Sequence, residues 1–308
     1  MSKKRSLCTD FSVYLVVRIL VCIIQTLPYA AACKVAAALA WLAVRIDKRH
    51  RQVAAENLRR AFPGRYNDVG PEEDVRSIYR HFCNLIIEII HLPRALHPGT
   101  WRRHVELRDA RMMIDALISG RPLLIVTGHF GNWEMGGYTL GLLGFKTHAI
   151  ARPLDNPFLD DYLRRFRERT GQGILAKKGD FDQMQALLAN GGVLATLADQ
   201  DAGQRGVFVD YFGRPASTHK AVALLALEYS VPMLVLGVRK VGEPMRYQPI
   251  CEDLILPEDY VGTRDAVKAI TQRFTSALER IVRTAPEQYF WLHRRWKHQP
   301  AKSKRSAA

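Results

Sequence analysis

A histidine and a glutamate lie five positions apart in segment 127–134, which reads TGHFGNWE. The ring of His129 can change its charge near neutral pH, so it can act as a general base toward a hydroxyl. Glu134 would hold one ring nitrogen protonated and leave the other to take the proton. The same two residues could instead form a structural hydrogen bond in a turn, and the pair alone does not decide between these interpretations.

The residues around the histidine predict a strand followed by a helix. Residues 122–127 (PLLIVT) form a buried apolar run, and residues 133–143 suit a helix, so His129 is expected at the carboxyl edge of a strand. The glycines on either side of it let a second molecule approach the backbone closely. The helix that begins near Asn132 directs free N–H groups to the same spot, where those of residues 131–133 could stabilise an oxyanion.

The elements that must position these groups alternate between short apolar runs and longer amphipathic ones. Five strands are predicted, at 122–127, 146–151, 193–197, 232–238 and 247–251. The helices between and after them are predicted at 133–143, 157–169, 181–189, 220–229 and 263–283. This alternation predicts an α/β fold with a largely parallel sheet that is covered by helices on both faces. In such folds the site lies beyond the carboxyl ends of the strands.

The N-terminal part of the chain is apolar and basic. Residues 11–27 (FSVYLVVRILVCIIQTL) are close to the lower length limit of a membrane span, and an alanine-rich run follows at 29–46. We interpret residues 1–50 as a membrane anchor that lies in or barely spans the bilayer, residues 51–298 as the α/β domain, and residues 299–308 as a disordered basic tail. The alternative is that the two apolar runs are buried core helices.

The 45 Lys and Arg residues exceed the 30 Asp and Glu residues, which gives a net charge of +15, and the excess is concentrated at the two ends of the chain. Such ends could bind nucleic acid, an anionic membrane or an acidic protein. The apolar N-terminus favours the membrane, because nucleic-acid binding would explain the basic ends but not the apolar run. The five cysteines form no C-x-x-C pair, and zinc, nucleotide and serine-hydrolase motifs are absent, so no metal or cofactor is expected.

Further charged residues are candidates for substrate binding. Arg152, Arg167 and Arg169 follow or belong to predicted elements near the site and could bind phosphate, although the last two could equally lie on a solvated helix face. Asp199 and Asp201 close the strand at 193–197 and should face the site, either to position the acceptor and order the basic groups or to cap a loop.

Aromatic and basic residues alternate in the C-terminal segment. The segment combines rings with cations, which suits contact with lipid headgroups or with an anionic glycolipid; the residues are Trp291, His293, Arg294, Arg295 and Trp296. We also count Asn132 among the expected substrate-binding residues because it lies inside the HFGNWE block. Glu88, the one acid near the apolar face of a predicted helix at 77–92, is interpreted as a paired helix acid without a role in catalysis.

Four ordered blocks make the pattern specific. They are HFGNWE, ARPLDNP at 151–157, LADQDAG at 197–203 and PEQYFWLHRRW at 286–296. With the NLRRAFPG stretch at 57–64, the chain closely resembles the late acyltransferases of lipid A biosynthesis, the lauroyl/myristoyl acyltransferase family within the lysophospholipid acyltransferase superfamily. The resemblance covers almost the whole chain.

This resemblance implies an enzyme at the inner membrane with its body on the cytoplasmic side. Such an enzyme moves a fatty acyl chain from acyl carrier protein or coenzyme A to a hydroxyl of a lipid A precursor, without a cofactor. The H-x-x-x-x-E histidine and acid, here His129 and Glu134, would carry catalysis, and residues 208–218 would cover the acyl groove. Two alternatives remain open: an acyltransferase for another lysolipid or glycolipid, such as a mannosylated inositol lipid or an ornithine lipid, and a non-catalytic lipid-binding membrane protein.

Overall fold

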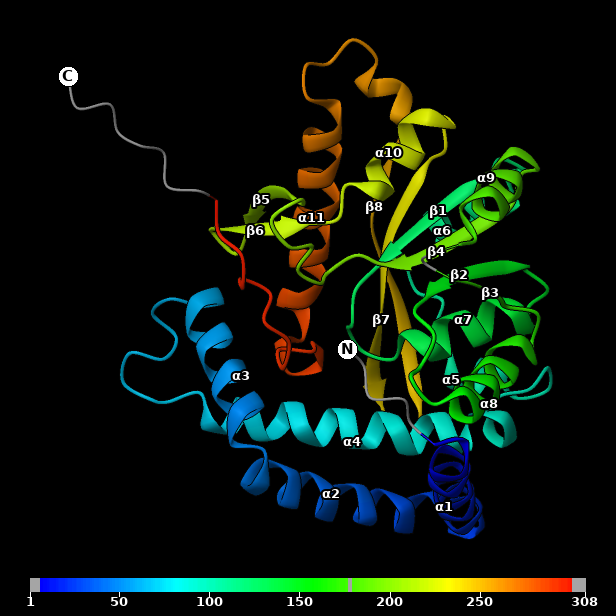
Figure 1. Cartoon of the computed structure of the whole chain (residues 1–308), viewed down its shortest axis with the longest axis vertical. Helices are drawn as coiled ribbons and strands as arrows, with labels where there is room; N and C mark the ends of the chain where they lie inside the picture. The colour runs from blue at the N-terminus through cyan, green and yellow to red at the C-terminus, as the bar shows by residue number, and fades with distance from the viewer. Residues whose placement is uncertain (1–5, 177–178, 301–308) are drawn as a thin grey trace.

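One mixed sheet organises the chain, in a computed structural model that describes residues 6–176 and 179–300 (Figure 1). Its strands, in the spatial order β3-β2-β4-β1-β7-β8, are β3 (Gly173–Ala176), β2 (Thr147–Ala151), β4 (Val193–Leu197), β1 (Leu123–Thr127), β7 (Met233–Gly242) and β8 (Arg246–Ile255). Neighbouring strands are parallel except for the last pair, in which β8 runs antiparallel to β7. The predicted, largely parallel sheet is confirmed.

Helices cover both faces of this sheet. Along β1, Leu124 and Val126 point into a core shared with three helices, which are α9 (Phe181–Ala189), α10 (Ala221–Glu228) and α11 (Ala266–Thr284). Leu123 and Ile125 point to the opposite face, into a core shared with α6 (Arg111–Ile118) and α7 (Trp133–Leu142). Alternation of side chains along a strand therefore gives the central strand two buried faces, as its continuous apolar sequence predicts.

The remaining elements lie around this centre. They are α3 (Lys48–Ala61), α4 (Glu72–Ala95), α5 (Trp101–His104), α8 (Pro157–Glu168), a hairpin of β5 (Val207–Tyr211) and β6 (Arg214–Thr218), and two 3-10 turns at Pro257–Tyr260 and Pro286–Gln288. The long helix α4 runs between the N-terminal helices and the body of the protein (Figure 1). Residues 301–308 of the predicted basic tail lie outside the described residues.

Two N-terminal helices, α1 (Leu7–Thr26) and α2 (Tyr29–Ile46), are long and apolar enough to cross a membrane by length and composition. Asp10 and Val21 are the buried residues of α1, and three alanines are those of α2, so neither is a core helix. The helix α2 packs on α4 through Ala32 and Ala36, which contact Ile87.

The helix α1 rests on α8. The rings of Phe11 and Phe158 lie 5.4 Å apart, and the guanidinium of Arg18 lies 4.3 Å from the ring centre of Tyr162. The apolar pair is thus attached to the body through small residues and aromatic contacts, while most of its large apolar side chains are exposed.

Candidate active site

The register between β1 and β4 places a histidine beside an aspartate. Thr127 at the end of β1 pairs with Leu197 at the end of β4, so the residues two positions further along each strand meet. There, His129 Nδ1 and Asp199 Oδ1 are 2.8 Å apart, and the backbone N–H of His129 donates to Asp199 Oδ2 at 2.8 Å. One carboxylate therefore fixes both the ring and the backbone of the histidine.

The prediction that Glu134 holds a ring nitrogen of His129 is wrong. The carboxylate of Glu134 instead receives two hydrogen bonds from Arg167, from Nε to Oε2 at 2.9 Å and from Nη2 to Oε1 at 2.5 Å. Glu134 is the second residue of α7, and its side chain faces Arg167 on α8. The Nδ1 atom of His129 is bonded to Asp199 instead. Glu134 and Arg167 are largely buried, and such a two-pronged pair is strong and specific in geometry.

Two opposing effects set the charge of the histidine. Burial of the ring lowers the pKa of His129, but the charge and hydrogen bond of Asp199, with a smaller effect from Glu134, outweigh burial and leave it raised. For Asp199, burial would raise the pKa, yet His129 keeps it well below its usual range. With Nδ1 donating to an ionised carboxylate, Nε2 is the nitrogen that can accept a proton.

The loop between β1 and α7 is held from several elements. Gly131 adopts a left-handed φ of 57°, its N–H donates to the carbonyl of Gln288 at 2.9 Å, and its carbonyl lies 3.2 Å from Nε2 of His81. Burial lowers the pKa of His81 to about 4, so that ring is neutral and donates from Nε2. The N–H of Asn132 donates to the carbonyl of Val238 at 2.9 Å.

These contacts correct the predicted oxyanion site. The amides of Gly131 and Asn132 are used by backbone carbonyls and cannot turn to a substrate. Of the three predicted amides, that of Trp133 remains, at the first position of α7, where helix geometry leaves N–H groups without an intrahelical partner. The Trp133 ring lies edge-on to His129, with ring centres 5.0 Å apart.

A cavity of about 1040 Å³ opens at the histidine and extends along both faces of the sheet. On one face its wall includes Ile125 and Ala195, and on the other face it includes Val222 and Leu225. His129 lies where these two apolar walls meet, at the carboxyl edge of the strands. The cavity can therefore hold long alkyl groups next to a base.

The structure brings some of the predicted binding residues to this cavity. Arg152, Arg167 and Asp201 line it, although Asp201 also lies 2.6 Å from Nδ1 of His298. Arg152 is exposed and lies 3.5 Å from Asp155. Asp199 is buried behind His129 and acts on it rather than on a substrate.

Other predicted contacts are not at the cavity. Arg169 is exposed just beyond the end of α8 and does not line the cavity wall. Asn132 was expected to bind substrate, but it is fully buried, because its side chain caps α7 by accepting from the Met135 N–H at 3.0 Å. Arg294 is exposed on the C-terminal segment.

The prediction of headgroup contact is wrong for three C-terminal residues. Arg295 is 2% exposed because its guanidinium donates to the Ser217 carbonyl and to Thr218 Oγ1. Trp291 and Trp296 are buried in the core.

The predicted cover of the acyl groove is also wrong, because residues 208–218 form the β5–β6 hairpin, none of whose residues lines the cavity.

Comparison with known proteins agrees with this geometry. A family model described as bacterial lipid A biosynthesis acyltransferase matches residues 1–298. The chain belongs to this family. It is therefore an acyltransferase, and the resemblance seen in the four sequence blocks is confirmed.

Similar proteins cover most of the chain. A lipid A biosynthesis lauroyltransferase of Escherichia coli (strain K12) is 27% identical, over 90% of this chain and 89% of its own length. A lipid A biosynthesis palmitoleoyltransferase of the same organism is 25% identical, over 89% of this chain and 87% of its own length. A phosphatidylinositol mannoside acyltransferase of Mycolicibacterium smegmatis is 24% identical, over 73% of both chains.

Proposed function

We propose that this acyltransferase moves a fatty acyl chain from a thioester, carried by acyl carrier protein or coenzyme A, to a hydroxyl of a lipid A precursor. The observation that carries the proposal is the His129–Asp199 pair, which opens on a cavity with apolar walls on both faces of the sheet. The lipid A relatives cover more of this chain than the mannoside relative does, which favours lipid A as the acceptor class.

The proposed reaction is direct transfer with the histidine as base. Nε2 of His129 takes the proton of the acceptor hydroxyl, and the hydroxyl oxygen attacks the thioester carbonyl carbon. When the tetrahedral intermediate collapses, the carbon–sulfur bond breaks and the imidazolium returns its proton to the leaving thiolate. A thioester is already activated, so this route needs no metal and no enzyme nucleophile. General base catalysis of this kind contributes about 10² to 10⁴-fold.

We assign the Glu134–Arg167 pair to the wall of the reaction site. The charge of Glu134 helps to keep the pKa of His129 raised, and Arg167 holds Glu134 in place. Arg152, exposed at the cavity, is available to a phosphate of the lipid acceptor or of the phosphopantetheine of the donor. Arg169 and Arg294 are exposed outside the cavity, so their role in substrate binding stays a prediction.

We propose that α1 and α2 hold the enzyme at the inner membrane, with the sheet on the cytoplasmic side, where thioester donors occur. Their exposed apolar side chains and the basic residues that flank them in the sequence support this placement. An acceptor that remains in the bilayer would then approach the cavity from the membrane surface.

Transfer by purified full-length protein tests the proposal. Wild type and His129→Ala are incubated with acyl carrier protein or coenzyme A thioesters of defined chain length and with a lipid A precursor, and the products are identified by mass spectrometry. Wild type should yield an acylated precursor, and His129→Ala should lose activity by about 10² to 10⁴-fold with its melting temperature retained. His50→Ala, which removes an exposed histidine paired with Asp47, is the matched control.

Two results would contradict the proposal. Full activity of His129→Ala would exclude the histidine as the base. Transfer to a mannosylated inositol lipid but not to a lipid A precursor would move the acceptor to the class named for the mycobacterial relative.

A further inference from the structure

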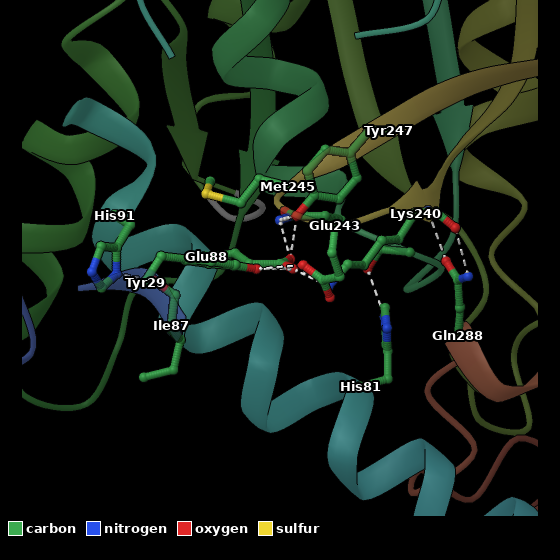
Figure 2. A network of polar contacts seen from close by, with 12 residues as sticks. Tyr29, His81, Ile87, Glu88, His91, Lys240, Glu243, Met245, Tyr247 and Gln288 are labelled. Atoms are coloured by element: carbon green, nitrogen blue, oxygen red, sulfur yellow. Dashed lines mark hydrogen bonds and ion pairs between the residues drawn. The ribbon is translucent and has the colours of Figure 1, made fainter. Parts of the chain in front are cut away.

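The carboxylate of Glu88 is buried in the middle of α4, with 1% of its surface exposed, and the proposed chemistry does not use it. Donors from α2, β7, β8 and the loop before α7 converge on it, and Figure 2 shows those from Tyr29, Lys240 and Tyr247. Lys240 Nζ of β7 lies 2.6 Å from Oε1, and the Tyr29 hydroxyl of α2 donates to Oε1 at 3.2 Å. The Tyr247 hydroxyl of β8 and Asn132 Nδ2 both donate to Oε2.

Through Asn132 this carboxylate reaches the catalytic loop. Asn132 lies between His129 and Glu134 in the sequence, and its side-chain oxygen caps α7 at the Met135 N–H. Its side-chain nitrogen is held 3.4 Å from Glu88 and 3.2 Å from the Tyr247 hydroxyl. Because one amide group both caps the helix and binds the carboxylate, a shift of Glu88 would move the start of α7.

Through Tyr29 the same carboxylate reaches the apolar helix pair. Tyr29 is the first residue of α2, and its single hydroxyl proton is shared between Glu88 Oε1 at 3.2 Å and Glu243 Oε2 at 3.0 Å (Figure 2). Next to Glu88 on α4, Ile87 packs against the alanines of α2. The hydrogen bond between Tyr29 and Glu88 therefore depends on how α2 is positioned on α4.

Buried charge of this kind is not explained by stability alone. A buried ion pair is often no more stabilising than apolar residues of equal volume, although removal of one partner is costly. Lys240, whose side chain is 13% exposed, pairs with Glu88 and also with the exposed Glu243, and both carboxylate oxygens of Glu88 are bonded. A fully satisfied network of this type fixes one geometry of the groups that it joins.

We propose that Glu88 is a positioning residue that couples the seating of α2, through Tyr29, to the geometry of the His129–Glu134 loop, through Asn132. The catalytic consequence rests on the proposed function, but the structural coupling does not. Docking of the apolar helices in a bilayer would then set the alignment of the base.

Hydrogen exchange and kinetics of the full-length protein in phospholipid vesicles test the coupling. Tyr29→Phe removes only the hydroxyl that Glu88 and Glu243 share, and Glu88→Gln removes the buried one of the two negative charges that Lys240 faces. Each variant should raise amide exchange in residues 128–136 by about tenfold, with exchange in α11 unchanged. Each should also lower kcat by about tenfold, with the KM of the lipid acceptor unchanged. Tyr66→Phe is the matched control, because its hydroxyl is bonded to Asp74, away from the cavity.

The outcomes are separable. Unchanged exchange in residues 128–136 of a folded Tyr29→Phe protein would overturn the coupling, even if Glu88→Gln fails to fold. Equal acceleration of exchange in α11 would assign Glu88 a merely structural role and would also overturn it. If the exchange changes as expected but the wild type transfers no acyl group, the coupling stands and the proposed function fails.

Discussion

At the residue scale, the two oxygens of Asp199 have different partners, and this determines the tautomer of His129. Oδ2 accepts from the backbone N–H of His129, which is always a donor, and Oδ1 faces Nδ1 of the ring. In Asp199→Asn the amide oxygen must therefore turn to the backbone, and the NH₂ group must turn to Nδ1. The ring would then carry its proton on Nε2, the nitrogen that should act as the base.

Asp199→Asn should consequently lower kcat by about 10⁴-fold, as the loss of the correct tautomer does in other histidine-based sites. The KM of the acceptor should change little, because Asp199 does not line the cavity. Steady-state kinetics with a defined thioester measures the effect. Asp47→Asn is a suitable control, because Asp47 likewise binds the backbone N–H and Nδ1 of a histidine, His50, but on the exposed start of α3. A comparable loss in both variants would refute the tautomer argument.

The raised pKa of His129 also predicts a pH profile. The neutral ring is the base, so activity should rise with pH and reach a plateau above a pKa that is higher than the ordinary value of about 6.5. Glu134→Gln removes a negative charge that raises this pKa, so its profile should shift to lower pH. Profiles of kcat/KM between about pH 5 and about pH 9 measure both effects. A wild-type midpoint below 6.5 would contradict the stated balance between burial and Asp199.

At the element scale, the turn from β1 into α7 depends on one glycine. A Cβ at Gly131 would lie 1.7 Å from the carbonyl oxygen of Val238, and its φ of 57° disfavours other residues. Gly131→Ala should therefore lower stability by on the order of 4 kcal/mol, with loss of the loop geometry.

Gly144→Ala separates the effect of the Cβ contact from the effect of the positive φ. Gly144 also has a positive φ, but a Cβ there would meet no atom within 4 Å. Thermal unfolding should thus show a much smaller loss for Gly144→Ala, about 1 kcal/mol. Equal losses in the two variants would mean that the backbone conformation, rather than the contact with β7, causes the loss of stability.

Sequence alone predicted the elements with long or continuous apolar patterns. The strands β1 and β4 and the helices α7 and α9 agree with their predicted ranges to within one residue. The strand β3 and the β5–β6 hairpin were missed, because β3 has only four residues (GILA) and β6 (RPAST) has no apolar run.

The candidate site could be predicted only in part, because a local sequence pattern does not show which strands are neighbours in the sheet. Asp199 and His129 each follow a predicted strand by two residues, but the adjacency of β1 and β4 depends on the strand order, which no local pattern contains. Closeness in sequence predicts Glu134 as the partner of His129, whereas strand adjacency supplies Asp199. The sequence predicts Arg295 as a headgroup contact, because its acceptors, Ser217 and Thr218, belong to a hairpin that no sequence pattern indicates.

At the scale of the whole molecule, the exposed apolar side chains are concentrated on α1 and α2, while the cavity opens at the carboxyl edge of the sheet. Burial of apolar area in a bilayer and attraction of the flanking cations to anionic lipid would act together. Only the electrostatic contribution to membrane binding weakens as the salt concentration rises. Membrane binding that is carried mainly by α1 should therefore persist at high ionic strength.

Val16, Leu20 and Ile23 on α1 are each more than half exposed, so their joint replacement by Ser should weaken membrane binding without unfolding the protein. Each lost side chain removes about 1 kcal/mol of burial, so vesicle partitioning should fall by about 100-fold for the triple variant. Flotation at about 1 M salt measures this step with the charge contribution screened. The matched control replaces Val69, Ile118 and Val261, which are even more exposed but lie on the body, and it should float like the wild type. If the two triple variants float alike, α1 is not the element that holds the protein at the bilayer.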